Sequence, residues 1–343
     1  DKLATTGRFG LGFNSVFHLT DVPSFVTGDH VVMFDPHERY VPGSTTTCRG
    51  LKIKFTDSDL LRNFPDQFAP YLHFGCNLTD KFDGTLFRFP LRDAVTAAES
   101  EISKTIYDEK SIDEMVDGMK VNIPKMLLFL RNVKQVELFV EDENDGSEVG
   151  EDNNDTPSSP VLIYRANVRS KRNVENVQQS GSITDFITGG DSKQPISKSQ
   201  FYSKLLQTPV ARLPKSTQIV SIAYNNIVDD FLVVTALGGG NCRVIACEES
   251  NRHMKFIPWG GVCCHLTRDG SVPPPLTGNA FCFLPLPVET NFNAHINGYF
   301  ELSANRRDIW IGADMTGDGR VRAEWNESLL RDVIAPLFVD MIH

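Results

Sequence analysis

A glycine-rich segment near the start of the chain constrains the fold more than any other feature of the sequence. It reads Gly7-Arg8-Phe9-Gly10-Leu11-Gly12-Phe13-Asn14-Ser15, so its glycines follow a G-x-x-G-x-G spacing. Glycines at this spacing let a backbone turn tightly and approach a ligand closely, and the apolar residues that overlap them favour a helix that begins here. Such a loop can hold phosphate on its amide groups. The spacing alone fits a glycine-rich turn without a ligand equally well.

The residues around the glycines are more restrictive than their spacing. The pattern Gly-x-Phe-Gly-x-Gly-Phe-x-Ser resembles the phosphate-binding box of the GHKL ATPases, the superfamily of heat-shock-protein-90-type chaperones, type II topoisomerases, MutL and sensor histidine kinases. Within that superfamily the chain resembles the sacsin repeats over most of its length, with a thin likeness between residues 141 and 215. The resemblance rests on Val16-Phe17-His18-Leu19-Thr20-Asp21-Val22-Pro23-Ser24-Phe25, Met33-Phe34-Asp35-Pro36-His37, Asp66-Gln67-Phe68-Ala69-Pro70, Gly84-Thr85-Leu86-Phe87-Arg88-Phe89-Pro90-Leu91-Arg92, Asn297-Gly298-Tyr299-Phe300 and the stretch from Leu302 to Trp310.

This resemblance implies a nucleotide site. The amides from Gly10 to Ser15 would cradle the phosphates of ATP bound with Mg²⁺, and Thr85 would help to bind the aspartate and the water that recognise adenine. Taken by itself, Thr85 also fits an ordinary strand residue, because threonine is favoured in strands. The implied cofactor-binding residues are Gly7, Phe9, Gly10, Leu11, Gly12, Phe13, Asn14, Ser15 and Thr85.

Two adjacent arginines, Arg306 and Arg307, are candidate catalytic residues. In ATPases of this kind a second domain commonly extends a basic side chain to the γ-phosphate, where positive charge stabilises the transferring group. Surface ion pairs with Asp308 or Glu301 fit these arginines at least as well. No metal site is expected from the chain itself, because its seven cysteines lack C-x-x-C spacing and their gaps are irregular.

The family's hydrolytic residues are expected upstream of the glycine segment. The resemblance implies a glutamate that activates water, an asparagine that holds Mg²⁺ and an aspartate that reads adenine, all before that segment. Because the chain starts at Asp1, it is expected to be a fragment cut within the ATPase module, with weak ATP binding or none. ATPase activity would then belong to the full-length protein at best. Other enzyme classes find no support, since G-x-S-x-G, H-E-x-x-H and P-loop motifs are missing.

The expected fold class is α+β. Residues 1–96 are expected to form the late part of a truncated two-layer α/β sandwich of the GHKL or Bergerat type. Its Gly28-Asp29 turn predicts a hairpin, and Asp57 is a candidate cap for a helix over 58–64. The other elements predicted here are a helix over 11–20 and strands over 24–27, 31–34, 51–55 and 85–91.

Residues 97–343 are expected to form a second α+β domain with an antiparallel sheet. A helical pattern over 97–132 carries a capping box from Ser111 to Glu114 and a proline, Pro124, that should kink or divide it. The glycines of residues 238–240 predict a hairpin turn, because no helix is expected after them. The predicted strands are 133–140, 161–168, 218–224, 229–237, 243–246 and 281–287, followed by an amphipathic helix from Ala323.

Two polar stretches interrupt this second domain. Residues 141–159 hold eight acidic residues and no basic one, which predicts a disordered acidic insertion at about 141–160 within a hairpin. A linker between domains and a docking site for a basic partner are the alternatives, the second less favoured because most charge runs are solvated surface. Residues 170–200 are rich in Ser, Gln and Asn and are expected to be mobile.

The net charge narrows the range of partners. A formal charge of −10 without a basic run argues against nucleic acid and against an anionic membrane. No apolar run reaches the length of a membrane helix, so a cytosolic or nuclear location is expected by default, and the cytoplasm is the compartment we predict. The resemblance implies a chaperone or co-chaperone with client proteins and the heat-shock-protein-70 system as partners. The alternative is a nucleotide-independent scaffold or interaction module on a degenerate ATPase fold.

Overall fold

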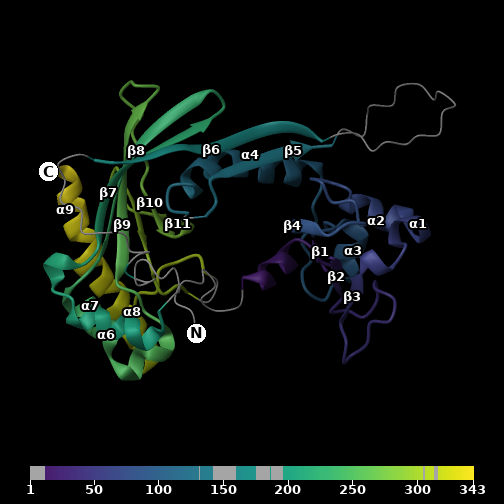
Figure 1. Cartoon of the computed structure of the whole chain (residues 1–343), viewed down its shortest axis with the longest axis horizontal. Coiled ribbons are helices and arrows are strands. Elements are labelled where there is room, and N and C mark those ends of the chain that lie inside the picture. Colours follow the sequence, from purple (N-terminus) through teal and green to yellow (C-terminus); the bar gives the residue numbers. More distant parts are fainter. Residues whose placement is uncertain are drawn as a thin grey trace. The chain divides into compact units, whose positions relative to one another are not determined.

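The computed structural model of the chain describes residues 12–130, 132–141, 160–174, 186, 196–303, 306–312 and 316–343. These residues form two compact units, an N-terminal unit that ends at Val116 and a C-terminal unit that begins at Asp117 (Figure 1). Each unit has its own sheet and its own helices, which confirms the α+β class. The domain limits expected from the sequence, 1–96 and 97–343, stay predictions, and the acidic insertion from residue 142 to residue 159 lies outside the described residues.

The N-terminal unit contains a four-stranded antiparallel sheet in the order β3-β2-β1-β4. The turn at Gly28 and Asp29 joins its first two strands, with Thr27 opposite His30, as the sequence predicts. Gly28 adopts a positive φ of 58°, the left-handed conformation that favours glycine. The strands are β1 (Ser24–Gly28), β2 (His30–Phe34), β3 (Gly50–Lys54) and β4 (Phe82–Arg88).

One face of this sheet carries the core of the unit. Strand side chains alternate between faces, so Val26 and Val31 are buried against Phe55 and Tyr71 while Phe25 lies on the opposite face. The short helices of the unit are η1 (Phe13–His18), η2 (Phe55–Asp57), α1 (Leu60–Asn63), α2 (Pro65–Phe68), η3 (Ala69–Tyr71) and α3 (Ala94–Glu99).

Two predicted helix caps in this part of the chain are wrong. Asp57 lies inside η2 and binds the Lys54 ammonium group, so it does not cap α1. The helix predicted over 97–132 divides into α3 and α4 (Glu109–Met126), and Asp108 accepts the backbone N–H of Ser111 at the start of α4. Pro124 lies inside α4, which ends two residues later.

The C-terminal unit contains an eight-stranded sheet in the order β11-β10-β12-β9-β8-β7-β6-β5. All neighbours pair antiparallel except β10 and β12. The turn between β7 and β8 uses Asn225 and Asn226, both with positive φ. The strands are β5 (Gln135–Val140), β6 (Val161–Asn173), β7 (Lys215–Tyr224), β8 (Ile227–Leu237), β9 (Trp259–Arg268), β10 (Asn279–Cys282), β11 (Leu284–Glu289) and β12 (His295–Gly298).

Helices pack on both faces of this larger sheet. The last turn of α4 and the residues after it, among them Ile123 and Leu127, pack on one face with Tyr164 and Val220. A cluster of helices covers the other face, where Trp325 stacks on Phe256 at 4.4 Å between ring centroids (Figure 1). These helices and turns are α6 (Lys198–Gln207), η4 (Val210–Arg212), α7 (Gly240–Cys247), η5 (Glu249–Met254), α8 (Asp318–Leu329), the π-helical turn η6 (Leu330–Ile334) and α9 (Ala335–Ile342).

Three sequence predictions are corrected in the C-terminal unit. Residues 243–246 are helical in α7, and residues 281–287 are divided between β10 and β11. The stretch 170–200, expected to be mobile, begins as ordered strand, because β6 continues to Asn173. The sequence reasoning also missed β9, the strand that pairs with β8 and β12. Residues 175–185 and 187–195 lie outside the described residues.

Candidate functional site

The described part of the glycine segment leads into η1, which lies on the aromatic face of the smaller sheet. Phe13 contacts Phe25, Phe34 and Phe87, with ring centroids 6.3, 5.0 and 6.4 Å away. Phe25 and Phe87 face the same side because they are paired across β1 and β4. The aromatic contacts therefore place the start of η1 over these two strands.

A polar row crosses the same face of the sheet. Thr85 on β4 pairs with Thr27 on β1, which pairs with His30 on β2, which pairs with Lys54 on β3. The two threonine hydroxyl oxygens lie 3.3 Å apart, and Thr27 Oγ1 donates to the Gly84 carbonyl at 3.0 Å. Thr85 is exposed. Thr85, the threonine expected on the adenine side of the site, therefore lies on an open surface, two residues along β4 from Phe87.

The backbone at Gly12 does not itself require glycine. Its φ of −59° and ψ of −38° are ordinary helical values, and no described heavy atom lies within 4 Å of the position that a Cβ would take. Ser15 is exposed and bonds within its own turn, since its N–H and its hydroxyl both donate to the Gly12 carbonyl, at 3.2 and 2.7 Å. The amides of Phe13 and Asn14 begin the helix, where backbone N–H groups have no partner within it. Gly7, Phe9, Gly10 and Leu11 lie outside the described residues.

The carboxyl-terminal end of η1 is bound by a buried arginine that the sequence reasoning missed. Arg92 is 1% exposed, its Nε donates to Asp21 Oδ1 at 2.7 Å, and its Nη2 forms an ion pair with the same oxygen at 2.6 Å. Its guanidinium also donates to two helix carbonyls, Nη1 to His18 at 2.8 Å and Nη2 to Phe17 at 2.6 Å. A cation suits this position because the last carbonyls of a helix carry partial negative charge.

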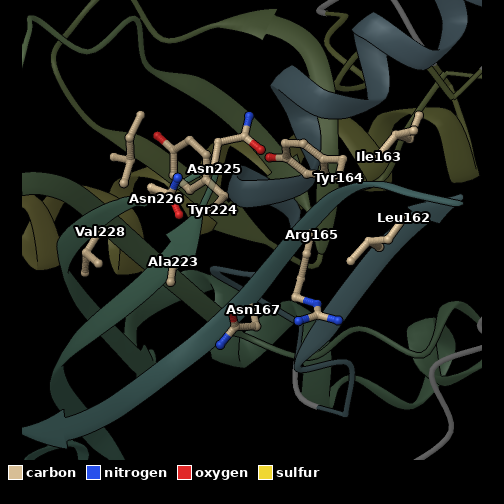
Figure 2. A pocket seen from close by; sticks show the side chains of 11 residues that line it. Leu162, Ile163, Tyr164, Arg165, Asn167, Ala223, Tyr224, Asn225, Asn226 and Val228 are labelled. Carbon is tan, nitrogen blue, oxygen red and sulfur yellow. The ribbon is translucent and has the colours of Figure 1, made fainter.

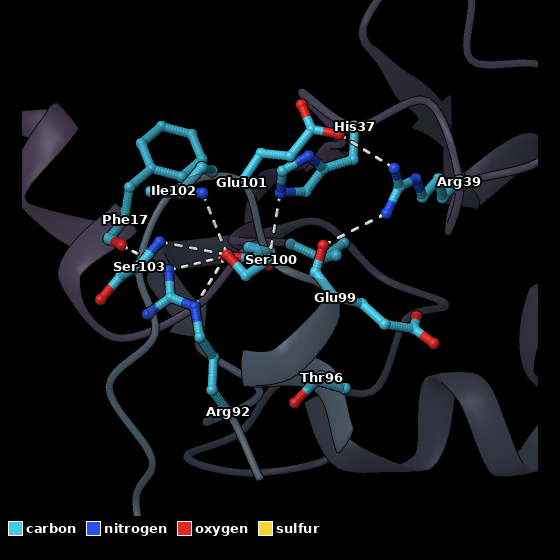
Figure 3. Close-up of polar contacts among 12 residues, drawn as sticks. Phe17, His37, Arg39, Arg92, Thr96, Glu99, Ser100, Glu101, Ile102 and Ser103 are labelled. Carbon is cyan, nitrogen blue, oxygen red and sulfur yellow. Dashed lines mark hydrogen bonds and ion pairs between the residues drawn. The ribbon is translucent and has the colours of Figure 1, made fainter. Parts of the chain in front are cut away.

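Further groups hold the Asp21 carboxylate in place, and Figure 3 shows Ser100, His37 and Arg92 among them, with dashed lines for polar contacts. The Ser100 hydroxyl donates to Asp21 Oδ1 at 3.0 Å and accepts the backbone N–H groups of Ile102 and Ser103, each at 3.1 Å. His37 Nε2 lies 3.3 Å from Asp21 Oδ2, close enough for an ion pair but without the alignment of a hydrogen bond. This buried cluster joins residues up to 79 positions apart in the sequence.

Arg306 and Arg307 belong to the C-terminal unit. Both side chains are exposed, and the backbone N–H of Arg306 donates to the Ser303 carbonyl at 2.8 Å in a short loop. Arg306 has a positive φ of 57°. The glycine segment belongs to the other unit, and the role of these arginines stays a prediction.

The second glycine cluster, residues 238–240, was predicted as a hairpin turn, and this prediction is wrong. The glycines lead from β8 into α7. Asp332 Oδ2 accepts the Cys242 N–H at 2.9 Å at the start of that helix. Burial by itself would raise the pKa of the Asp332 carboxyl, but hydrogen bonds from Arg331 and from the amides of Cys242 and Asn241 together hold that pKa below its ordinary value. A carboxylate of the protein thus takes the place that an anionic ligand would need.

A shallow pocket of about 440 Å³ lies beside the turn between β7 and β8 (Figure 2). Its charged side chain, Arg165, binds Glu137 at 2.5 Å, and its Tyr224 hydroxyl donates to Asp229. Arg268 also donates to Asp229, at 2.8 Å. Burial would raise the pKa of Asp229, but its hydrogen bonds from Arg268 and Tyr224 outweigh burial and lower it. These polar groups satisfy one another, so the pocket offers no clear ligand chemistry.

Signals for the buried Arg92 cluster were weak in the sequence. The sequence segments that contain Asp21 and Arg92 carried the family likeness, but no periodicity links two residues 71 positions apart.

Metal chemistry gains no support from the described residues, where no group of three or more His, Cys, Asp or Glu side chains could hold an ion. Among the helices that the structure describes, none is both long and apolar enough to span a membrane.

Comparisons with known proteins agree with the family likeness of the sequence segments described above. The family model of the Sacsin domain matches residues 1–152. Human Sacsin is 30% identical over 353 aligned positions, which cover 98% of this chain. The chain spans only 7% of the length of that relative. Residues 1–152 thus match the Sacsin domain, and nearly the whole chain is similar to part of human Sacsin.

Proposed function

We propose that the chain is part of a GHKL-type, heat-shock-protein-90-like nucleotide-binding module, with ATP and Mg²⁺ as its ligand, in a chaperone or co-chaperone. The observation that carries this proposal is the open position at Gly12. Glycine there is not required by the backbone dihedrals, and no described neighbour excludes a side chain. A glycine that the fold does not need fits a backbone that a ligand approaches closely.

The position of Thr85 supports the same proposed site, at the end where the base would bind. Phe25 and Phe87, on which Phe13 packs, are two residues along their strands from Thr27 and Thr85. Two strand residues span about 7 Å, and both lie on one face. A nucleotide with its phosphates at Gly12 and its base towards Thr85 therefore needs only one surface of one sheet.

The rest of the proposal concerns the whole protein. Client proteins and the heat-shock-protein-70 system are the proposed partners, and the cytoplasm is the proposed compartment. A role for Arg306 or Arg307 at the γ-phosphate requires that a basic side chain from the C-terminal unit reach the nucleotide when ATP is bound. The match to the Sacsin domain and the likeness to human Sacsin support these proposals.

A valine at Gly12 tests the phosphate loop. We expect Gly12→Val, made in the full polypeptide that carries this chain, to weaken ATP binding by about tenfold or more in calorimetry, because the side chain enters the space of the phosphates. Adenosine, which has no phosphate, should bind within about twofold of the wild-type affinity, and the melting temperature should stay unchanged. Equal ATP affinity and equal ATP turnover in the two proteins would remove the glycine segment from the mechanism.

A valine at Thr85 tests the proposed base side. Thr85→Val keeps the branched shape and removes the hydroxyl, so strand stability should change little. Adenosine and ATP affinity should fall together, by about fivefold, the loss of one net hydrogen bond. A variant that binds both ligands as the wild type does would argue against the base lying near Thr85.

One observation favours the second candidate, a nucleotide-independent scaffold. The N–H and hydroxyl of Ser15, expected to face phosphate, both donate to the chain's own Gly12 carbonyl. If wild-type protein shows no ATP binding or turnover, a scaffold that binds other proteins becomes the better description. The presence or loss of the upstream glutamate, asparagine and aspartate in the parent sequence would separate the two candidates independently.

A further inference from the structure

The described side-chain hydrogen bonds of Arg92 all go to one short segment of the chain. A guanidinium that is 1% exposed is costly unless its donors are paired. Its described acceptors are the carbonyls of Phe17 and His18 and the carboxylate of Asp21, all within five consecutive residues. The buried charge is thereby matched by the end of η1 and the turn that follows it.

The helix that receives these bonds has little to hold it otherwise. η1 is six residues of 3₁₀-helix and contains no fully buried residue. Short 3₁₀ segments have poorer hydrogen-bond geometry than α-helix and are marginal by themselves. Phe13 secures the first turn on the aromatic face, so the polar contacts of Arg92 are what fix the other end.

Tyr107 adds a second tie to the same carbonyl. Its hydroxyl donates to the His18 carbonyl at 3.1 Å, and its backbone N–H donates to the Arg92 carbonyl at 2.8 Å. His18 thus accepts from both side chains, while Ser100 and His37 hold the far side of Asp21. The guanidinium, the phenol and the carboxylate form one anchor under η1.

We propose that Arg92 is the positioning residue of the described part of the glycine segment, from Gly12 to Ser15. By fixing the carboxyl-terminal end of η1, it keeps the backbone from Gly12 to Ser15 in place over the sheet. The consequence for ligand affinity rests on the proposed nucleotide site, whereas the anchoring of η1 does not. Loss of the anchor should therefore weaken the phosphate contacts selectively and leave the sheet intact.

Hydrogen exchange tests the anchor without any ligand. In Arg92→Lys a single ammonium cannot reproduce the planar set of contacts to Asp21 and the two carbonyls. The amides of Leu19 and Thr20, which donate to the Val16 carbonyl, should then exchange about tenfold faster or more, with the β1–β2 amides unchanged. Arg62→Lys, at an exposed position in α1, is the matched control and should change neither set.

Nucleotide affinity tests the consequence for the ligand. Arg92→Lys in the full polypeptide should weaken ATP binding by about tenfold and adenosine binding by less than about twofold, since only ATP uses the phosphate contacts. Tyr107→Phe removes one hydroxyl and should give a smaller effect of the same kind. It also carries both tests if Arg92→Lys fails to fold.

Each outcome decides one of the two claims. Faster exchange confined to η1 supports the anchor even if wild-type protein binds no ATP, a result that would defeat the nucleotide proposal alone. Exchange that rises throughout the N-terminal unit, or equal losses of ATP and adenosine affinity, would show Arg92 to be a general core residue. Unchanged exchange in both variants would overturn the anchor.

Discussion

The chain holds two glycine clusters, and the space around their described glycines differs. At Gly12 an added Cβ would meet no described atom within 4 Å. At Gly238 it would overlap the Val333 side chain, and at Gly240 it would lie 2.7 Å from the Asp332 carboxyl carbon. The second cluster is glycine because helices pack against it. Among the described residues, no packing of this kind requires glycine at Gly12, and this difference is what the proposed close approach of a ligand would explain.

The largest expected effect comes from filling the packed cluster. Gly238→Ala would place a methyl group into Val333, and overpacking of this kind costs about 1–3 kcal/mol. We expect a loss at the upper end of that range, because the segment after β8 and η6 must separate to relieve the overlap. Denaturant unfolding followed by tryptophan fluorescence measures it. A loss below about 0.5 kcal/mol would show that this turn yields easily and would weaken the contrast with Gly12.

A middle-sized effect is expected at the carboxylate that caps α7. Asp332→Ala leaves the Cys242 amide without its acceptor and should cost about 1–2 kcal/mol. Because the pKa of Asp332 is lowered in the folded chain, its contribution is present above about pH 4 and is lost as the pH falls through the folded pKa. The variant and the wild type should therefore converge in stability at acid pH. Glu327→Ala, on an exposed helical position, is the control.

The smallest effect is expected at the open cluster. Gly12→Ala should leave the free energy of unfolding within about 0.5 kcal/mol of wild type, or raise it slightly, because alanine accepts the helical dihedrals and restricts the unfolded chain. Thermal unfolding of the variant beside Gly238→Ala measures the difference directly. A loss comparable to that of Gly238→Ala would mean that Gly12 is glycine for packing, and the ligand argument would fail.

Sequence patterns predicted elements whose signals are local. The hairpins at Gly28-Asp29 and Asn225-Asn226 were predictable because turn residues separate two alternating apolar runs. Residues 243–246 were misassigned because a short run with three apolar residues fits a strand or a helix, and the carboxylate at the start of that helix, Asp332, comes 90 residues after Cys242. Strand β9 was missed because Gly260 and Gly261 interrupt its pattern.

The candidate site shows the same difference between local signals and long-range contacts. The glycine segment and Thr85 could be proposed from residue phrases, whereas the Arg92 anchor depends on contacts across 71 to 75 positions that no local pattern encodes. Which side chains are buried together is decided by tertiary packing, and an ion pair of this kind is visible only once the strands are assembled.

The placement of the aromatic residues gives each unit its own optical signal. All three tryptophans, Trp259, Trp310 and Trp325, lie in the C-terminal unit. Indole emission will therefore follow the unfolding of that unit alone, while far-ultraviolet circular dichroism follows both. If the units melt separately, the two spectroscopic transitions will not coincide, and the mismatch will measure how strongly one unit depends on the other.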